Sequence, residues 1–231
     1  MEAQLVFSRR ELVMQRLMDA VTHGYSFWQS GSVSIERCLN LVKKFELNFQ
    51  TSADRNLRVR RKRAGLGNAK LILWRDKEII FWFLLVTPPN SGLHAAHSLE
   101  KLQDAFMQGQ RITINGFELV RITKKGAGKN GTSLTWRMEE QQYKGWRHSV
   151  IATVRKGSSR QMDELLRKLW SAPGFHGIRS QIGKLVALYR AECKRRSRKD
   201  APQPPKRLPY LRRMRNYGDL LPYLTSQRRS S

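Results

Sequence analysis

The feature that most restricts the fold is a nearly uninterrupted apolar run, Ile79 to Thr87, in the middle of a strongly basic chain. Its branched and aromatic side chains favour a β-strand. Because apolar residues point to both sides, this strand must be central and covered on both faces. Lys70 to Trp74 predicts a neighbouring strand across the turn Arg75 to Glu78. The eight residues from Ile79 to Val86 are too few to span a membrane.

Other strands and helices are predicted on both sides of this pair. Asn115-Gly116, between Arg111–Ile114 and Phe117–Thr123, is typical of a two-residue hairpin turn, and Thr132–Met138 reads as a further strand. Ser158 and Gln161 have the spacing of a capping box. Hydrophobic periodicity predicts helices over 8–24, 33–45, 95–107, 139–156, 159–170 and 178–199. We therefore expect an α+β fold: an antiparallel sheet of about five strands, flanked by N-terminal and C-terminal helices.

Changes in composition divide the chain into five segments. The last carries five of the eight prolines, so we expect it to have no packed core. The alternative is a short docked helix that contains Tyr210, Leu211, Met214, Tyr217, Leu220 and Leu221. The segments are an N-terminal strand with helices (1–54), a basic arm (55–69), a sheet with one helix (70–138), a helical segment (139–199) and a Pro-rich basic tail (200–231).

Charge is the strongest indication of function. The 231 residues contain 44 Lys and Arg against 18 Asp and Glu, for a formal charge of +26, and +10 of this lies in 194–231. A compact fold with such an excess repels itself unless a polyanion neutralises it, and nucleic acid is the commonest such partner. Since 40% of the residues are apolar, the chain also has enough material for a core.

The cysteines and the membrane criteria indicate a cytoplasmic protein. Cys38 and Cys193 have no partner at metal-ligand spacing, which argues against a zinc finger or a disulfide scaffold and fits a reducing compartment. No apolar segment predicts a signal peptide or a membrane span. We expect no membrane association, no cofactor and no metal.

Three basic clusters are the predicted nucleic-acid contacts. The first has six cations in nine residues and no carboxylate before Asp76, so a flexible or β-like arm is expected to follow successive phosphates. The second ends the last predicted helix, and the third is a glycine-rich loop without P-loop spacing. The predicted residues are Arg55, Arg58, Arg60, Arg61, Lys62 and Arg63; Arg190, Lys194, Arg195, Arg196, Arg198 and Lys199; and Lys124, Lys125 and Lys129.

Catalytic signals are weak. His94 and His97 are three residues apart, but no third metal ligand stands nearby, which favours a structural role. A metal-free ribonuclease needs only groups such as His, Tyr, Lys or Arg around a 2′-hydroxyl. His23, Tyr25 and His148 are the first candidates for that chemistry.

Several strings resemble a known group of proteins across most of the chain. They are Gly24–Gly31 (GYSFWQSG), Arg63–Ala69 (RAGLGNA), Phe83–Pro88 (FLLVTP), Gly116–Val120 (GFELV) and Ser171–Phe175 (SAPGF). These strings are similar to those of small basic proteins of proteobacterial plasmids and integrative conjugative elements. The resemblance implies a mobile-element setting and assigns no site.

A second resemblance is to CRISPR repeat-processing endoribonucleases. These open with a strand and a helix in a ferredoxin-like domain and hold a stem-loop with basic helices. The predicted start of this chain fits that pattern, so the resemblance implies a partly ferredoxin-like fold. It supplies no catalytic motif that can be matched residue by residue.

The predicted function is binding of RNA or DNA through the phosphate backbone, within a mobile element or a ribonucleoprotein that contains other proteins. Two alternatives remain open. One is a metal-independent endoribonuclease that processes a structured RNA such as a CRISPR transcript. The other is a non-catalytic assembly factor that docks on acidic protein.

Overall fold

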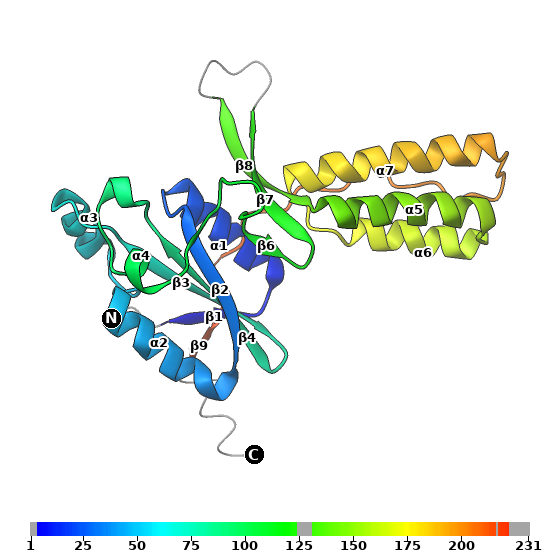
Figure 1. Ribbon diagram of the computed structural model, residues 1–231. Helices are drawn as coiled ribbons and strands as arrows, with labels where there is room; N and C mark the ends of the chain where they lie inside the picture. Colours follow the sequence, from blue (N-terminus) through cyan, green and yellow to red (C-terminus); the bar gives the residue numbers. More distant parts are fainter. Residues whose placement is uncertain (1–3, 124–130, 216, 222–231) are drawn as a thin grey trace. The chain divides into compact units, whose positions relative to one another are not determined.

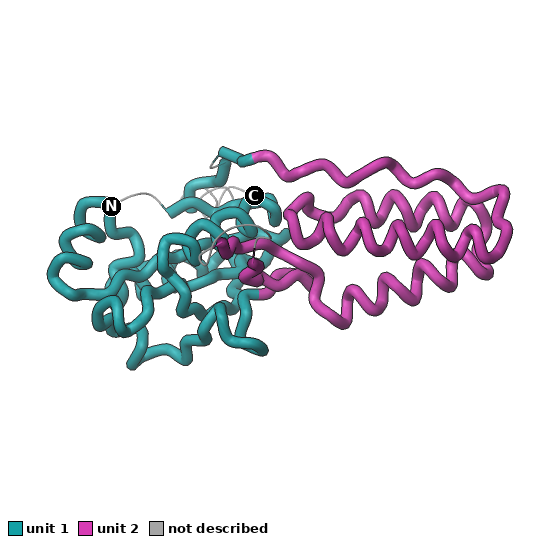
Figure 2. The backbone as a smooth tube through the Cα atoms, turned by 90° about the horizontal axis from the view of Figure 1, so that it is seen from above, with its two compact units in different colours: residues 1–112, 213–231 teal, residues 113–212 magenta. Residues whose placement is uncertain are grey.

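The computed structural model describes residues 4–123, 131–215 and 217–221 (Figure 1). The chain forms two compact units (Figure 2). Unit 1 comprises residues 1–112 and 213–231, and unit 2 comprises residues 113–212. The predicted sheet segment 70–138 is therefore shared between the units, and so is the tail.

Unit 1 is built on a six-stranded sheet in the order β5-β2-β4-β3-β1-β9. The apolar strand β4 pairs antiparallel along its whole length with β2 and with β3, which gives it the central position expected. β1 pairs parallel with β3, so the sheet is mixed. The strands are β1 (Leu5–Phe7), β2 (Phe27–Ser34), β3 (Ala69–Asp76), β4 (Ile79–Val86), β5 (Gln103–Asp104) and β9 (Asp219–Leu220).

Both faces of this sheet are covered. Leu71, Leu73 and Leu84 belong to a core cluster with four side chains of α2. Ile72 and Leu85, which alternate with them on the opposite face, are equally buried. α1 packs against β3. The helices of unit 1 are α1 (Arg10–Thr22), α2 (Ile35–Phe49), α3 (Arg55–Arg63), the short α4 (Ala96–Leu99) and the 3-10 turn η1 (Pro89–Ser91).

Unit 2 combines a three-stranded antiparallel sheet, β6-β7-β8, with three helices. The hairpin turn is confirmed, because Asn115 and Gly116 take φ angles of 45° and 79°. The capping box is also confirmed: Gln161 N donates to Ser158 Oγ, and Ser158 N donates to Gln161 Oε1. The elements are β6 (Thr113–Ile114), β7 (Phe117–Thr123), β8 (Thr132–Met138), α5 (Glu140–Lys156), α6 (Ser159–Trp170) and α7 (His176–Arg195).

The α+β class, with sheets flanked by helices, is confirmed, although the strands form two sheets and not one. The ferredoxin-like β-α-β-β-α-β order is not followed, since α2 and α3 both lie between β2 and β3. The predicted helix over 95–107 is wrong beyond Leu99. There Gln103 and Asp104 pair with β2, and these sheet contacts override the helical periodicity.

The predicted basic arm is also wrong in conformation, because Arg55–Arg63 is the helix α3. Asp54 Oδ1 accepts a hydrogen bond from Leu57 N at 2.7 Å and caps its N-terminus. Arg and Lys have high helix propensity, and four of these cations lie in the last turn, where they oppose the negative end of the helix dipole.

The described part of the tail packs in part, which differs from the expected absence of a packed core, and it does so without the short helix that was the alternative. Leu208 in unit 2 and Leu221 in unit 1 are 5% and 1% exposed, respectively. β9 pairs antiparallel with β1, and Leu221 N donates to Gln4 O at 3.2 Å. The apolar side chains of this segment are few, but Leu208 and Leu221 each fill a site that the rest of their unit provides. Within the described ranges, no helix is long and apolar enough to span a bilayer.

His94 has a structural role that predicts a pH dependence. Its Nδ1 accepts a hydrogen bond from Ala96 N, so its Nε2 carries the proton and donates to Phe49 O at 3.2 Å. Burial lowers the pKa of His94 below its usual 6.5, against the raising effect of the bond to Phe49. The unfolded chain then binds the proton more readily than the folded chain does.

We therefore expect the free energy of unfolding to decrease as the pH falls below about 6.5, the unfolded pKa of histidine, and to level off below the folded pKa. Urea unfolding between pH 8 and pH 5 measures this. The His94→Gln variant should lose the part of the slope that His94 contributes. An identical slope in the variant contradicts the assignment.

Candidate nucleic-acid interface

A cavity of about 530 Å³ lies beside α3 in unit 1. We call it the α3 cavity. Its wall combines the end of α1, one side of α3, the ends of β3 and β4 next to it, and the segment at Arg213. Five cations from these separate segments line it: Arg55, Arg58, Lys62, Lys70 and Arg213.

Because α3 is a helix, some cations of the basic run line the cavity and others do not. Arg55, Arg58 and Lys62 are spaced i, i+3 and i+7, so they share one face of the helix and line the cavity. Arg60 and Arg63 are exposed and do not line it. Half of the six predicted cations are therefore brought to one place.

Arg61 has a different role. Its Nε and Nη2 donate to Gly67 O at 3.0 and 2.9 Å, and its Nη1 donates to Gln50 Oε1. These bonds fix the chain after α3 to the end of α2. Its guanidinium group is thus engaged within the fold, and a contact of Arg61 with phosphate stays a prediction.

The cavity wall has little negative charge of its own. Among the described residues that line it, Asp19 is the one carboxylate. Its oxygens accept from Arg16 at 2.8 Å and from both terminal nitrogens of Arg213 at 2.7 Å. Burial acts to raise the pKa of Asp19, but the hydrogen bonds from Arg213 and Arg16 outweigh it and lower the pKa. Asp19 is therefore already compensated, and the positive charge of Arg55, Arg58 and Lys62 is not cancelled by it.

Two buried polar atoms of the lining have no hydrogen-bond partner among the described residues. They are Arg58 Nε and Asn68 Oδ1. Asn68 Nδ2 donates to Arg58 O at 3.3 Å, which places the two residues side by side. Buried polar atoms are normally hydrogen-bonded, so this donor and this acceptor are available to a water molecule or a polar ligand at this wall.

His23 and Tyr25, two of the three predicted ribonuclease candidates, also line the cavity. His23 Nδ1 lies 2.6 Å from Asp19 O. A carbonyl oxygen only accepts, so Nδ1 carries the proton and Nε2 is left as the acceptor. Burial raises the pKa of the Tyr25 hydroxyl, against the lowering effect of Arg58, so this group is a neutral donor at pH 7. The third candidate, His148, is on α5 in unit 2.

The predicted cluster at the end of α7 is also divided by its contacts. Arg198 donates to the carbonyl oxygens of Val154 and Gly157 at 2.8 and 2.9 Å, and it pairs with Asp200. It therefore caps the end of α5, and its contact with phosphate stays a prediction. Arg195 pairs with the buried carboxylate of Glu192 at 2.7 Å.

The remaining predicted residues are placed as follows. Lys194, Arg196 and Lys199 are exposed at the end of α7, and Arg190 is exposed on the same helix. Lys124, Lys125 and Lys129 lie outside the described residues.

Sequence reasoning missed Lys70 and Arg213. Each lies in a segment whose local pattern predicts only a strand or a tail, and neither belongs to a basic run of the predicted clusters. One signal was present for α3 itself: Asp54 stands directly before a run of good helix formers, which is the position of an N-cap.

The part of the chain that the structure describes contains no cluster of metal-ligating side chains. No three His, Cys, Asp or Glu side chains gather there in a way that could hold an ion. His94 and His97 instead bond to backbone groups of unit 1.

The site stands without support from known relatives. No protein-family model matches the chain, and no curated protein and no solved structure matches it significantly.

Proposed function

We propose that the protein binds nucleic acid, and that the α3 cavity in unit 1 holds its phosphates. The observation that carries this proposal is the convergence of five cations from separate segments on a wall whose one carboxylate, Asp19, pairs with one of them, Arg213, and with Arg16. Arginine presents a planar array of donors that matches phosphate oxygens. The unpartnered Arg58 Nε supplies one such donor.

The distribution of the remaining charge favours a long polyanion. Exposed cations also occur in unit 2, at the end of α7. A folded acidic protein presents its charges on one surface, whereas a nucleic acid carries one on every nucleotide and engages many scattered cations at once. We therefore favour nucleic acid over an acidic protein partner.

The test compares two pairs of substitutions on the same helix. We expect Arg55→Ala/Lys62→Ala to lower affinity about tenfold or more at low salt, because both side chains line the cavity. Arg60→Ala/Arg63→Ala removes the same charge from the same helix outside the cavity, and we expect an effect of about threefold or less. Fluorescence anisotropy with labelled RNA and DNA measures both. Equal losses in the two pairs contradict a site at the cavity.

A second function is favoured by the position of His23 and Tyr25 in the same cavity. His23 Nε2 is an acceptor that can take the proton of a ribose 2′-hydroxyl, and Tyr25 is a neutral donor. The 2′-oxygen would then attack the adjacent phosphorus, and the bond to the 5′-oxygen would break as that oxygen gains a proton. The products are a 2′,3′-cyclic phosphate and a free 5′-hydroxyl.

Incubating end-labelled RNA with the protein in a chelator tests this activity. We expect His23→Ala and Tyr25→Phe to abolish cleavage while binding is retained. Intact RNA after long incubation with the unsubstituted protein leaves binding as the function.

A further inference from the structure

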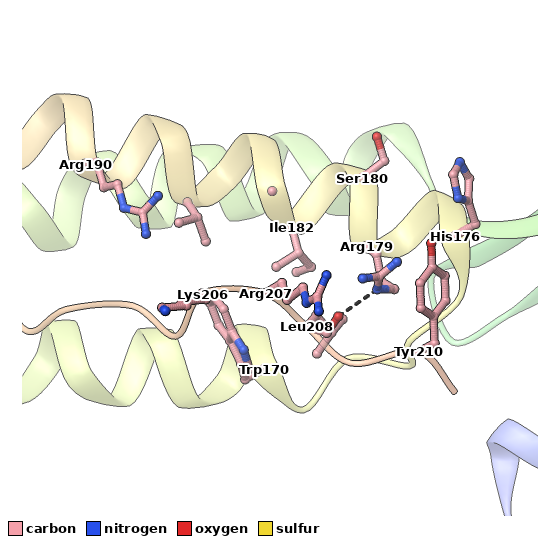
Figure 3. A pocket seen from close by; sticks show the side chains of 12 residues that line it. Trp170, His176, Arg179, Ser180, Ile182, Arg190, Lys206, Arg207, Leu208 and Tyr210 are labelled. Atoms are coloured by element: carbon pink, nitrogen blue, oxygen red, sulfur yellow. Dashed lines mark hydrogen bonds between the residues drawn. The ribbon is translucent and has the colours of Figure 1, made fainter. Parts of the chain in front are cut away.

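Unit 2 contains a second cavity whose lining is unlike that of the α3 cavity. It has a volume of about 340 Å³ and lies between α7, the end of α6 and residues 206–210 of the tail (Figure 3). We call it the α7 groove. Its lining is cationic, aromatic and apolar together, and none of the described residues that form it is an Asp or Glu.

The tail segment 201–212 forms one wall and is held along α7 by hydrogen bonds. Tyr189 Oη donates to Pro202 O at 2.9 Å, Arg179 Nε donates to Leu208 O at 2.7 Å, and Leu211 N donates to Gly174 O at 3.1 Å. Prolines fix much of the backbone of this segment. The side chains that it contributes to the groove are therefore presented from a rigid wall.

Four cations line the groove: Arg179 and Arg190 on α7, and Lys206 and Arg207 on the tail segment. Arg190, Lys206 and Arg207 are exposed and form no ion pair within the described residues. Arg179 and Arg190 are eleven positions apart, or roughly 16 Å along the helix axis at 1.5 Å per residue. The groove therefore suits a ligand with several negative charges in a row.

Aromatic surface lies beside this charge. The guanidinium carbon of Arg179 lies 3.3 Å from the centroid of the Tyr210 ring and covers one face of it. Tyr210 is nevertheless 64% exposed, so its other face is open. Trp170 also lines the groove, and its buried Nε1 has no hydrogen-bond acceptor among the described residues. Ile182, Val186 and Leu208 supply apolar contacts.

We infer that the α7 groove binds a single-stranded segment of nucleic acid, with one base stacked on Tyr210 and the phosphates on Arg190, Lys206 and Arg207. An exposed ring beside unpaired cations is the arrangement that binds unpaired bases, because every base has a flat face to stack. A duplex keeps its bases inside and gains nothing from the ring. The inference adds a second site to the proposed function and does not depend on the α3 cavity.

The test uses the full chain and three labelled probes: a ten-nucleotide oligouridine RNA, the matching oligothymidine DNA and a duplex of the same length. We expect Tyr210→Ala to lower affinity for the single strands about tenfold and to leave duplex affinity unchanged. Lys206→Ala/Arg207→Ala should lower single-strand affinity by about tenfold or more at low salt. All three side chains are exposed, so the variants should fold, and thermal melting checks this.

The matched control is Arg147→Ala/Lys184→Ala, which removes two exposed cations of unit 2 that do not line the groove. We expect it to change single-strand affinity about threefold or less. Crosslinking of a 5-bromouridine oligonucleotide should place its adduct in a peptide that contains Tyr210 or Trp170. Equal losses in control and groove variants, an equal effect of Tyr210→Ala on duplex, or adducts elsewhere would overturn the inference.

The two sites are distinguishable in the same measurements. If Arg55→Ala/Lys62→Ala has no effect on affinity while the groove variants lose single-strand binding, the result contradicts phosphate binding at the α3 cavity. The same result supports single-strand binding at the α7 groove. The opposite pattern overturns the groove and leaves the proposed function intact.

Discussion

Raising the salt concentration from about 50 to about 200 mM should lower the affinity for nucleic acid by about 20- to 40-fold. Each phosphate that a cation neutralises releases counterions, and the logarithm of affinity falls with the logarithm of salt by about 0.7 to 0.9 per contact. Three contacts, one for each cation that α3 contributes to the α3 cavity, correspond to a slope of about −2.1 to −2.7. This is the largest effect that we expect on binding.

The same titration on the variants tests where the contacts lie. Arg55→Ala/Lys62→Ala removes two cations of the cavity and should reduce the slope by about two. Arg60→Ala/Arg63→Ala should change it by less than about one. A flat response of the unsubstituted protein between the two salt concentrations rules out phosphate contacts as the main source of affinity. The fold would be unaffected by that result.

The parts of the fold that could be predicted are those that local chemistry determines. The turn at Asn115-Gly116 needs residues that accept a positive φ, and the box between Ser158 and Gln161 needs a hydroxyl and an amide three positions apart. The eight apolar residues of β4 require cover on both faces. Each of these signals lies within one short window, and each was confirmed.

The errors arise where distant segments decide the structure. The sequence around Gln103 contains no local signal for its pairing with Trp28 of β2. This pairing is incompatible with the helix predicted over 95–107. Leu221 is buried because β9 adds to the edge of a sheet whose other strands lie more than 110 residues earlier. The prolines and charges of the tail are typical of an unpacked segment. The composition of the tail therefore does not predict the pairing of β9 with β1.

Only the part of the candidate site that lies in one short stretch of sequence could be predicted. Arg55, Arg58 and Lys62 stand in one basic run, and helical spacing is enough to place them on one face. Lys70 and Arg213 join them only through the packing of β3 and of the returning tail. The pairing of Asp19 with Arg213, which neutralises the one carboxylate of the lining, spans 194 positions and has no local signal.

Removal of the residues after Arg212 is the change from which we expect the largest effect on stability. Ending the chain after Arg212 should lower the melting temperature by about 10 °C or more, because Leu221 and the bonds that hold the tail in unit 1 are lost together. Arg213 pairs with Asp19, and Met214 bonds through its backbone N and O to Gln15 and Arg16. Burial of a leucine at 1% exposure is worth about 2–5 kcal/mol by itself, judged from Leu→Ala substitutions. Each 1 kcal/mol shifts the melting temperature of a chain of this size by about 2–4 °C.

Single substitutions separate the contributions to this effect. Leu221→Ala should lower the free energy of unfolding by about 2–4 kcal/mol, whereas Leu47→Ala, on a side chain that is 85% exposed, should change it by less than about 0.5 kcal/mol. Urea unfolding of both variants, beside the chain that ends at Leu221 and the one that ends at Arg212, measures each step. If the chain that ends at Arg212 has the same melting temperature as the full-length protein, β9 and Leu221 do not stabilise unit 1. The truncation also removes Arg213 from the α3 cavity, because residues 213–221 carry both its pair with Asp19 and the packing of Leu221.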